Sequence, residues 1–219
     1  IVLPEMFTTG FCTSPSGNAE NDGAALAWMK AIPAMYGAAV TGSIAVEDGG
    51  RYYNRMYFVK PDGSHVQYDK RHLFSFGGEH REYTPGGERV IVEHYGFRLL
   101  LQVCYDLRFP VFSRNRGDYD MVVYFAAWPV ASRAVWDTLL RARAIETVCY
   151  VVGVNRTGRE PGLEYNGGSV LVDFKGYQIA SASDDTEQII IGEVSKEALD
   201  EFHTRFPALD DADGFELDI

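Results

Sequence analysis

The chain has 219 residues, 46% of them hydrophobic and 23% charged, which is typical of a chain that buries one substantial core. Lysine and arginine total 20 against 31 aspartates and glutamates, so the formal net charge of -11 disfavours nucleic acid and anionic membranes as partners. Three cysteines without close spacing predict free thiols and a cytoplasmic location. We expect a single domain over residues 1–219, with no signal peptide, lipid anchor or membrane span.

The first residues have the pattern of a buried strand that stops early. Residues 1–3 are apolar, and the proline that follows lacks a backbone donor, so Glu5 stands at the mouth of the strand. After a polar loop, residues 22–36 predict a helix that we expect to break or bend near Pro33. Residues 38–46 predict the next strand.

A hairpin follows, and it places a lysine at a second strand end. Residues 51–60 and 65–69 predict two strands. The residues between them, 61–63, have the sequence Pro-Asp-Gly, which is typical of a tight turn. Lys70 comes directly after the second strand. Residues 76–86 are rich in glycine and predict a long surface loop that lines or covers a pocket.

A second hairpin ends in a cysteine. Residues 90–95 and 97–103 predict strands on either side of a glycine, and Cys104 follows the second strand, just before an Arg-Phe-Pro sequence that cannot continue it. A lone cysteine most often packs as a small hydrophobic residue, and we expect this of Cys12 and Cys149. At a strand-to-loop junction, however, a thiol is placed as a nucleophile would be.

The remaining chain alternates strands and helices. Apolar residues at helical spacing predict one helix and place Arg141 and Arg143 on its other faces, and Ser195 caps a final helix with a glutamate in its first turn. The pattern alone indicates a mixed α/β or α+β fold. Strands are predicted over residues 121–127, 150–154, 169–174, 178–182 and 188–194, and the helical spacing is that of Val135, Leu139, Ala142 and Ile145.

A carboxylate, an ammonium and a thiol thus each stand at a strand end. Glu5, Lys70 and Cys104 are the groups that amide cleavage by a thiol requires, since the thiol needs a base and the developing oxyanion needs a cation. The set works only if the three side chains converge, which a sheet can arrange and sequence spacing does not prove.

The motifs LPEMF, YDKRHLF and VCYDLRFP, which contain these three residues, resemble the nitrilase (carbon-nitrogen hydrolase) superfamily, most closely its omega-amidase branch. The similarity continues through DYDMVVYFAAWP, RARAIE, YVVGVNR and GGSVLVDFKG. The resemblance implies an α-β-β-α sandwich with mixed sheets flanked by helices. It also implies a homodimer, no cofactor, no metal, and hydrolysis of the terminal amide of a small dicarboxylate monoamide such as 2-oxoglutaramate. The family's first strand and helix are expected to be missing from this sequence.

The resemblance assigns roles to the matched residues. Glu5 is the base that takes the Cys104 proton, gives it to the departing ammonia and later activates water. Lys70 faces the oxygen of the tetrahedral intermediate together with the backbone N–H of Tyr105. Glu79 corresponds to the family's additional acidic residue, which positions the lysine, and Glu82 is its rival on the same loop.

Substrate-binding residues are predicted on the loops. Trp128 and Phe11 are candidates for walls of the pocket, as is the Tyr105 ring, although core packing explains aromatic residues more often. Arg133 is a candidate for gripping a substrate carboxylate in a bidentate fork, and a surface position explains it equally well. Arg108 is expected to brace the nucleophile loop by pairing with a carboxylate.

Other interpretations compete with the amidase hypothesis. Four histidines near Asp69 and Glu79 suggest a metal site without the usual ligand spacing, namely His65, His72, His80 and His94. A Cys-His-Asp protease could combine Cys104 with His72 or His80, but no local signature supports it. A nitrilase or an N-carbamoyl amidohydrolase would use the same triad with other loops, and a noncatalytic interaction protein could retain the same fold.

Overall fold

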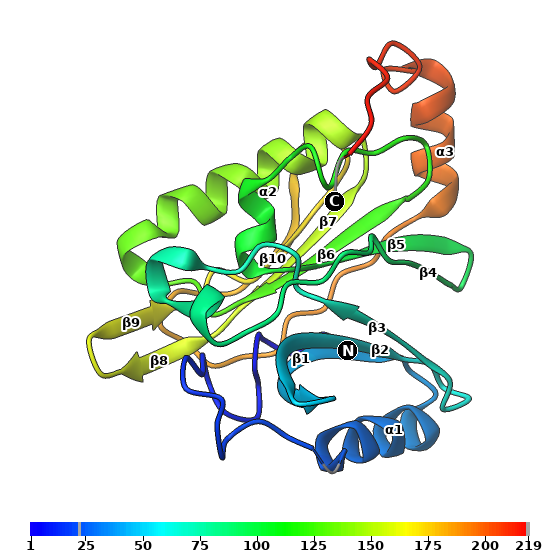
Figure 1. Ribbon diagram of the computed structural model, residues 1–219. Helices are drawn as coiled ribbons and strands as arrows, with labels where there is room; N and C mark the ends of the chain where they lie inside the picture. Colours follow the sequence, from blue (N-terminus) through cyan, green and yellow to red (C-terminus); the bar gives the residue numbers. More distant parts are fainter. Residues whose placement is uncertain (22, 218–219) are drawn as a thin grey trace.

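Two β-sheets stack face to face between helices in the computed structural model, which describes residues 1–21 and 23–217. Helix α1 (Ala24–Tyr36) covers the outer face of one sheet, and α2 (Arg133–Thr147) covers the outer face of the other, with α3 (Lys196–Arg205) beside the second sheet near the C-terminus (Figure 1). The predicted α-β-β-α sandwich is therefore confirmed.

The smaller sheet is an antiparallel meander of three strands. Strands β1 (Val40–Asp48), β2 (Arg51–Val59) and β3 (His65–Asp69) lie in the order β1-β2-β3. The predicted hairpin of β2 and β3 is present. At the start of the chain, Val2 forms a parallel bridge with Thr41 of β1, so the first residues extend this sheet.

The larger sheet has six strands in the order β11-β10-β7-β6-β5-β4. Its centre is parallel, β5 to β6 and β6 to β7, and its edges are antiparallel. Parallel strands end at the same edge, so the segments after β5 and β6 start side by side. The strands are β4 (Ile91–His94), β5 (Phe97–Val103), β6 (Met121–Ala126), β7 (Tyr150–Asn155), β10 (Val170–Val172) and β11 (Gln178–Ser181).

Short elements complete the chain and carry much of the site. Four 3-10 turns, η1 (Ser75–Gly77), η2 (Glu79–Arg81), η3 (Cys104–Arg108) and η4 (Val130–Ser132), follow strand ends or precede α2. A separate hairpin of β8 (Thr157–Glu160) and β9 (Leu163–Asn166) was not predicted from the sequence.

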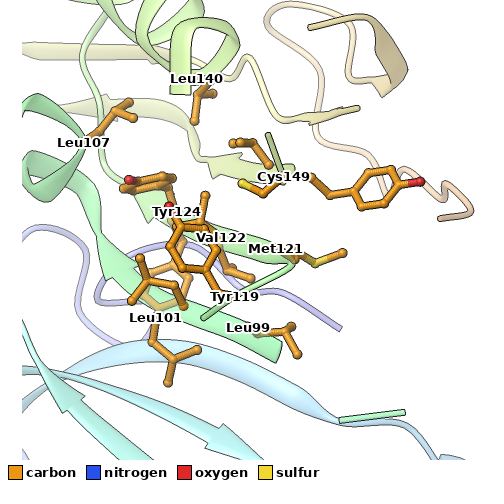
Figure 2. Packing of buried hydrophobic residues seen from close by; sticks show 14 of the residues in the cluster. Leu99, Leu101, Leu107, Tyr119, Met121, Val122, Tyr124, Leu140 and Cys149 are labelled. Carbon is orange, nitrogen blue, oxygen red and sulfur yellow. The ribbon is translucent and has the colours of Figure 1, made fainter. Parts of the chain in front are cut away.

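One cluster of buried side chains joins the two sheets. Met56 and Tyr68 of the small sheet belong to the same apolar cluster as Leu101 of β5, while Leu140 of α2 belongs to it from the other side of the large sheet. Figure 2 shows Leu99 and Leu101 on the side of the small sheet and Leu107 and Leu140 on the helix side. Both faces of β5 and β6 are thus buried, as their continuous apolar runs predict.

Three predictions need correction. The first helix does not break at Pro33 but continues to Tyr36, because a proline one turn before the end removes only one hydrogen bond and Gly37 N–H still reaches the Pro33 carbonyl (2.8 Å). The predicted first residue of that helix, Asp22, lies outside the described residues. Residues 188–194 form no strand, although their composition is strand-like, because they gain no ladder partner. The predicted apolar face of α2 is not its buried face, because Ala142 and Ile145 are exposed. Arg143 lies on another face, as predicted, but that face is the one turned inward with Trp136 and Leu140.

Among the described residues, no helix combines the length and the apolar character that crossing a bilayer requires.

Candidate active site

Glu5 is held at one end of the small sheet by hydrogen bonds from the backbone N–H groups on both sides of it. Leu3 N–H donates to the Thr41 carbonyl (2.8 Å), and Met6 N–H donates to the Ser43 hydroxyl (3.0 Å). The Glu5 side chain is 1% exposed, and one carboxylate oxygen accepts the backbone N–H of Ala127 (2.9 Å), just after β6. These contacts direct the carboxylate between the two sheets. Residues 1–3 form a single β-bridge and Ile1 is 57% exposed, so the buried strand predicted there is not present.

Lys70 lies fully buried between two carboxylates. Its Nζ is 2.9 Å from Glu5 Oε1 and 2.8 Å from Glu79 Oε2, and all three side chains are excluded from solvent. Burial alone would lower the pKa of Lys70, but the charges of Glu5, Glu79 and Cys104 and a hydrogen bond to Glu79 raise it well above its usual value. The lysine is therefore an ammonium at neutral pH.

Glu79, rather than its rival, reaches the lysine. It begins the turn η2 and accepts the Phe74 N–H (2.6 Å) in addition to the lysine, so the loop after β3 folds back over Lys70. Glu82, three residues later, is exposed.

Asn54 is a central residue that the sequence analysis missed. Its amide nitrogen donates to Glu5 Oε1 (2.8 Å) and to Glu79 Oε1 (3.0 Å), and its carbonyl accepts the Lys70 N–H (3.0 Å). The buried side chain thus cross-links the two carboxylates, while the backbone carbonyl of the same residue fixes the lysine backbone. The only signal in the sequence was a polar residue in the buried half of a strand. Such a residue can belong to a site or can simply pack, and the sequence does not distinguish the two.

Cys104 starts a sharp turn at the end of β5. It is the first residue of η3, it is 8% exposed, and its φ of 47° lies in the left-handed region that residues with a side chain rarely adopt. Such conformations persist where the surroundings over-determine them, and they concentrate at functional sites. The turn directs the thiol towards Glu5. The next residue, Tyr105, belongs to the same turn.

The thiol lies beside the two charged residues. Burial is the main cause that raises the pKa of Cys104 well above 9.0, and the Glu5 charge and a hydrogen bond from the thiol to Glu5 add to the rise, against the opposing effect of Lys70. Glu5, Lys70 and Cys104 are therefore brought together, as the strand-end hypothesis requires. The thiol is neutral at physiological pH.

Two further residues that the sequence analysis missed support the cysteine turn. Asp106 is fully buried and accepts the Val103 N–H (2.9 Å). Arg143 of α2 donates to the Leu107 carbonyl (2.8 Å) and to the Ser113 hydroxyl (2.8 Å). Arg143 therefore braces the nucleophile turn, which is the role that the sequence predicted for Arg108.

Aromatic rings surround the triad. The Lys70 ammonium lies 5.6 Å from the centroid of Phe11, and the Tyr105 ring packs edge-on against Phe74 (5.1 Å). Trp128 is 4% exposed, follows the Ala127 amide that holds Glu5, and donates its indole N–H to the Ser132 carbonyl (2.9 Å). Of the three predicted aromatic residues, Phe11 contacts Lys70, Tyr105 follows Cys104 in the chain, and Trp128 follows the residue whose N–H binds Glu5.

The two candidate arginines differ in what they contact. The Arg133 guanidinium is engaged by Asp137 (2.8 Å), Asp184 (2.9 Å) and Asn166 (3.2 Å). Arg108 is exposed and lies over the Trp128 ring, 5.3 Å from its centroid. Within residues 1–21 and 23–217, no carboxylate forms an ion pair with Arg108.

The histidines considered for a metal site lie in separate surroundings. His72 Nδ1 is bound to Asp106 (2.8 Å), His65 packs near the Tyr57 ring, and His94 packs against Phe58. In the part of the chain that the structure describes, no group of three or more His, Cys, Asp or Glu residues is arranged to hold a metal ion.

Comparison with known proteins shows the family. The family model of carbon-nitrogen hydrolases matches residues 1–204. The chain is 46% identical to an omega-amidase YafV of Yersinia enterocolitica, over 99% of this chain and 85% of that protein, and 34% identical to a 2-oxoglutaramate amidase of Bacillus subtilis, over 96% and 83%. A crystal structure of XC1258 from Xanthomonas campestris, described as a CN-hydrolase superfamily protein with an arsenic adduct in the active site, superposes with a TM-score of 0.95. It is 45% identical and covers 99% of this chain and 85% of its own.

The chain therefore belongs to the carbon-nitrogen hydrolase family, and the resemblance read from its motifs is confirmed. It is a hydrolase of carbon–nitrogen bonds other than peptide bonds, of the cysteine-dependent amidase type.

The raised pKa of Cys104 predicts how its reactivity depends on pH. In a Cys12→Ser background, we expect the rate of alkylation of Cys104 by iodoacetamide to keep rising through pH 9.0 without a plateau, because burial and Glu5 oppose ionisation of the thiol. Glu5→Gln removes a charge and an acceptor that both raise this pKa, so the profile should shift to lower pH. Mass spectrometry of the labelled peptide follows both rates. An unchanged or upward-shifted profile in Glu5→Gln would contradict the assigned contact.

Proposed function

We propose that this protein is an omega-amidase that hydrolyses the terminal amide of a small dicarboxylate monoamide, such as 2-oxoglutaramate, through a thioester on Cys104. The observation that carries the proposal is the convergence of Glu5, Lys70 and Cys104 in one buried cluster. The named activities of the relatives from Yersinia enterocolitica and Bacillus subtilis support this substrate class.

In the proposed acylation, the Cys104 sulfur attacks the amide carbonyl carbon while Glu5 takes the thiol proton. The hydrogen bond from the thiol to Glu5 supplies the path for this transfer. Collapse of the tetrahedral intermediate breaks the carbon–nitrogen bond, and Glu5 passes the proton to the departing nitrogen, which leaves as ammonia. Glu5 then takes a proton from water, the hydroxide attacks the thioester, and the thiol and the free acid are regenerated.

The oxyanion of both tetrahedral intermediates is stabilised by Lys70 and, in this proposal, by the backbone N–H of Tyr105. Lys70 suits the role because its neighbours keep it protonated and because Glu79 and Asn54 hold it in place. Charges act strongly here, since the charged side chains are buried away from water.

We assign the substrate carboxylate to Arg108. The loop position in the sequence made Arg133 a candidate for this contact, but three oxygen acceptors already engage that guanidinium. Arg108 stands on the turn that Cys104 begins, with its guanidinium over Trp128 and its donors available to a ligand. A guanidinium binds a carboxylate through two parallel hydrogen bonds. Phe11 and Trp128 then serve as walls of the pocket.

Replacing the triad residues tests the proposed chemistry. Cys104→Ala should lower turnover of 2-oxoglutaramate by at least about 10³-fold, and Glu5→Gln and Lys70→Met by about 10²-fold to 10³-fold, with losses that do not add. Cys149→Ala removes another buried thiol and should leave turnover intact. Lys70→Met leaves two buried carboxylates without their cation, so its rate is normalised to the folded fraction measured by circular dichroism.

Ammonia release from 2-oxoglutaramate, a nitrile and an N-carbamoyl amino acid distinguishes the alternative activities on the same triad. Preference for either of the last two would replace the omega-amidase assignment. Full turnover by Cys104→Ala would end the thiol mechanism, and silence of the wild type on all three substrates would favour a noncatalytic protein.

The arginine assignment predicts a difference between two matched variants. Arg108→Met should raise the KM for 2-oxoglutaramate by about 10-fold to 100-fold, the range expected for loss of a charge-assisted contact, while an uncharged amide such as butyramide is affected little. Arg133→Met should change this KM by less than about threefold, because the substitution removes no contact with the substrate. Steady-state kinetics on both substrates measures the contrast. A larger KM effect in Arg133→Met would return the carboxylate to that residue.

We propose a homodimer with an interface along α2, β11 and the extended segment after β11. This surface carries exposed apolar side chains, Ile145, Ile179, Ile189 and Ile191, the last two 92% and 86% exposed. Exposed isoleucines in such number mark an interaction surface, and the family resemblance supplies a second copy of this chain as the occupant.

The dimer is tested with Ile189→Asp combined with Ile191→Asp. We expect the wild type to elute with twice the mass of one chain in size-exclusion chromatography with light scattering, and the double variant to elute as a monomer, because two charges in an apolar interface are costly to desolvate. Phe76→Asp, which changes an exposed aromatic residue of the loop after β3, is the control and should remain dimeric. A monomeric wild type would refute the proposal.

We further propose that the chain forms one domain that works in the cytoplasm without nucleic acid or membrane partners. All three cysteines are free, and the net charge of -11 opposes polyanions. Cell fractionation with an antibody against the native protein tests the location, and recovery of the protein in a membrane or extracellular fraction would refute it.

A further inference from the structure

Asp106 accepts four hydrogen bonds although solvent does not reach it. Its Oδ2 accepts the Val103 N–H (2.9 Å) and the Tyr68 hydroxyl (2.8 Å), and its Oδ1 accepts the His72 N–H (2.9 Å) and contacts His72 Nδ1 (2.8 Å). An ionised carboxylate has only acceptors, so His72 Nδ1 carries the proton in this contact. A buried carboxylate that satisfies both oxygens in this way is firmly fixed.

The donors come from two segments that carry two members of the triad. Tyr68 and His72 stand two residues before and two residues after Lys70, while Val103 directly precedes Cys104. Asp106 therefore ties the end of β3 to the end of β5 on both sides of the lysine. The sheets that carry these strands are different, so packing alone leaves their relative position adjustable.

Both sides of this tie are themselves held. The His72 ring stacks on Phe109 with centroids 3.9 Å apart, and the Tyr68 hydroxyl also accepts the Arg71 N–H (3.1 Å). Burial, and after it the Asp106 charge, raises the pKa of Tyr68 well above its usual value, so the phenol remains a donor.

The same carboxylate closes the turn in which Cys104 is strained. Its bond to the Val103 N–H caps η3 at the residue before the cysteine, whose φ is 47°. A left-handed cysteine needs surrounding contacts that outweigh its steric cost, and the capped turn supplies one.

We propose that Asp106 is a positioning residue: with Tyr68 and His72 it sets the separation of Lys70 from Cys104 and holds Cys104 in its left-handed conformation. This inference rests on the proposed function, because it assumes that Cys104 attacks and that Lys70 faces the oxyanion. Asp106 itself does not touch the substrate. It acts by keeping the attacking sulfur and the stabilising cation in register.

The test compares two buried tyrosines. Tyr68→Phe removes one donor to Asp106. Tyr150→Phe is the matched control: its hydroxyl also donates one hydrogen bond, to the Ser195 carbonyl, and accepts one, from the Ser195 N–H. Ser195 lies at the start of α3, away from the triad. Because small misplacement of reacting groups is costly, we expect Tyr68→Phe to lower kcat about tenfold or more with KM changed less than about twofold. Tyr150→Phe should keep the wild-type kcat, with a similar change in melting temperature.

A double-mutant cycle asks whether Tyr68 acts through Asp106. In an Asp106→Asn background, adding Tyr68→Phe should cost less than about threefold in kcat, since coupled residues do not contribute additively. If Asp106→Asn does not fold, His72→Phe, which keeps the stacked ring but loses the Nδ1 donor to the same carboxylate, replaces it as the background. Tyr68→Phe should then cost less in kcat than it does in the wild type, because both donors act through Asp106.

The outcomes separate this inference from the proposed function. An active wild type, a silent Cys104→Ala and a Tyr68→Phe variant indistinguishable in kcat from Tyr150→Phe would overturn the positioning role alone. Full additivity in the cycle would do the same. Activity that survives Cys104→Ala would instead overturn the proposed function beneath it.

Discussion

A single ammonium buried between two buried carboxylates is the interaction on which the site depends. Lys70 pairs with Glu5 and Glu79, and none of the three side chains meets solvent. Removing charges from water is costly, and the cost is recovered only with good geometry and with every remaining acceptor satisfied. Asn54 donates to both carboxylates at once, so the chain start, β2, β3 and the loop after β3 must meet at one point.

The charge of this cluster also sets the state of the nucleophile. Burial disfavours the thiolate form of Cys104, and two carboxylates against one ammonium leave an excess of negative charge beside it. Both effects raise the pKa of the thiol. Many reactive cysteines instead sit as thiolates beside cations. In the mechanism we propose, the proton leaves for Glu5 only as the sulfur attacks, and the thiol therefore remains inert towards other electrophiles until a substrate carbonyl enters.

The sequence allowed the strand ends to be predicted but not the contacts that make them a site. Prolines and tight turns are local signals, and they correctly placed Lys70 and Cys104 after strands, whereas Glu5 follows only a single β-bridge. Asn54 and Asp106 gave no such signal, because their partners lie 49 and 38 residues away and leave no periodicity. The strand predicted at residues 188–194 was wrong for a related reason, since strand composition produces a strand only where an edge pairs with it.

The charge that we expect to bind the substrate is opposite in sign to the net charge of the whole chain. The molecule is acidic overall, yet the substrate we propose is an anion, so attraction has to be local. Arg133 cannot provide it while Asp137 and Asp184 neutralise its guanidinium. Arg108 lies instead on an aromatic face, which orients a guanidinium without neutralising it. The turn that begins with the nucleophile thus also carries the cation that we expect to select its substrate, and one 3-10 element fixes their spacing.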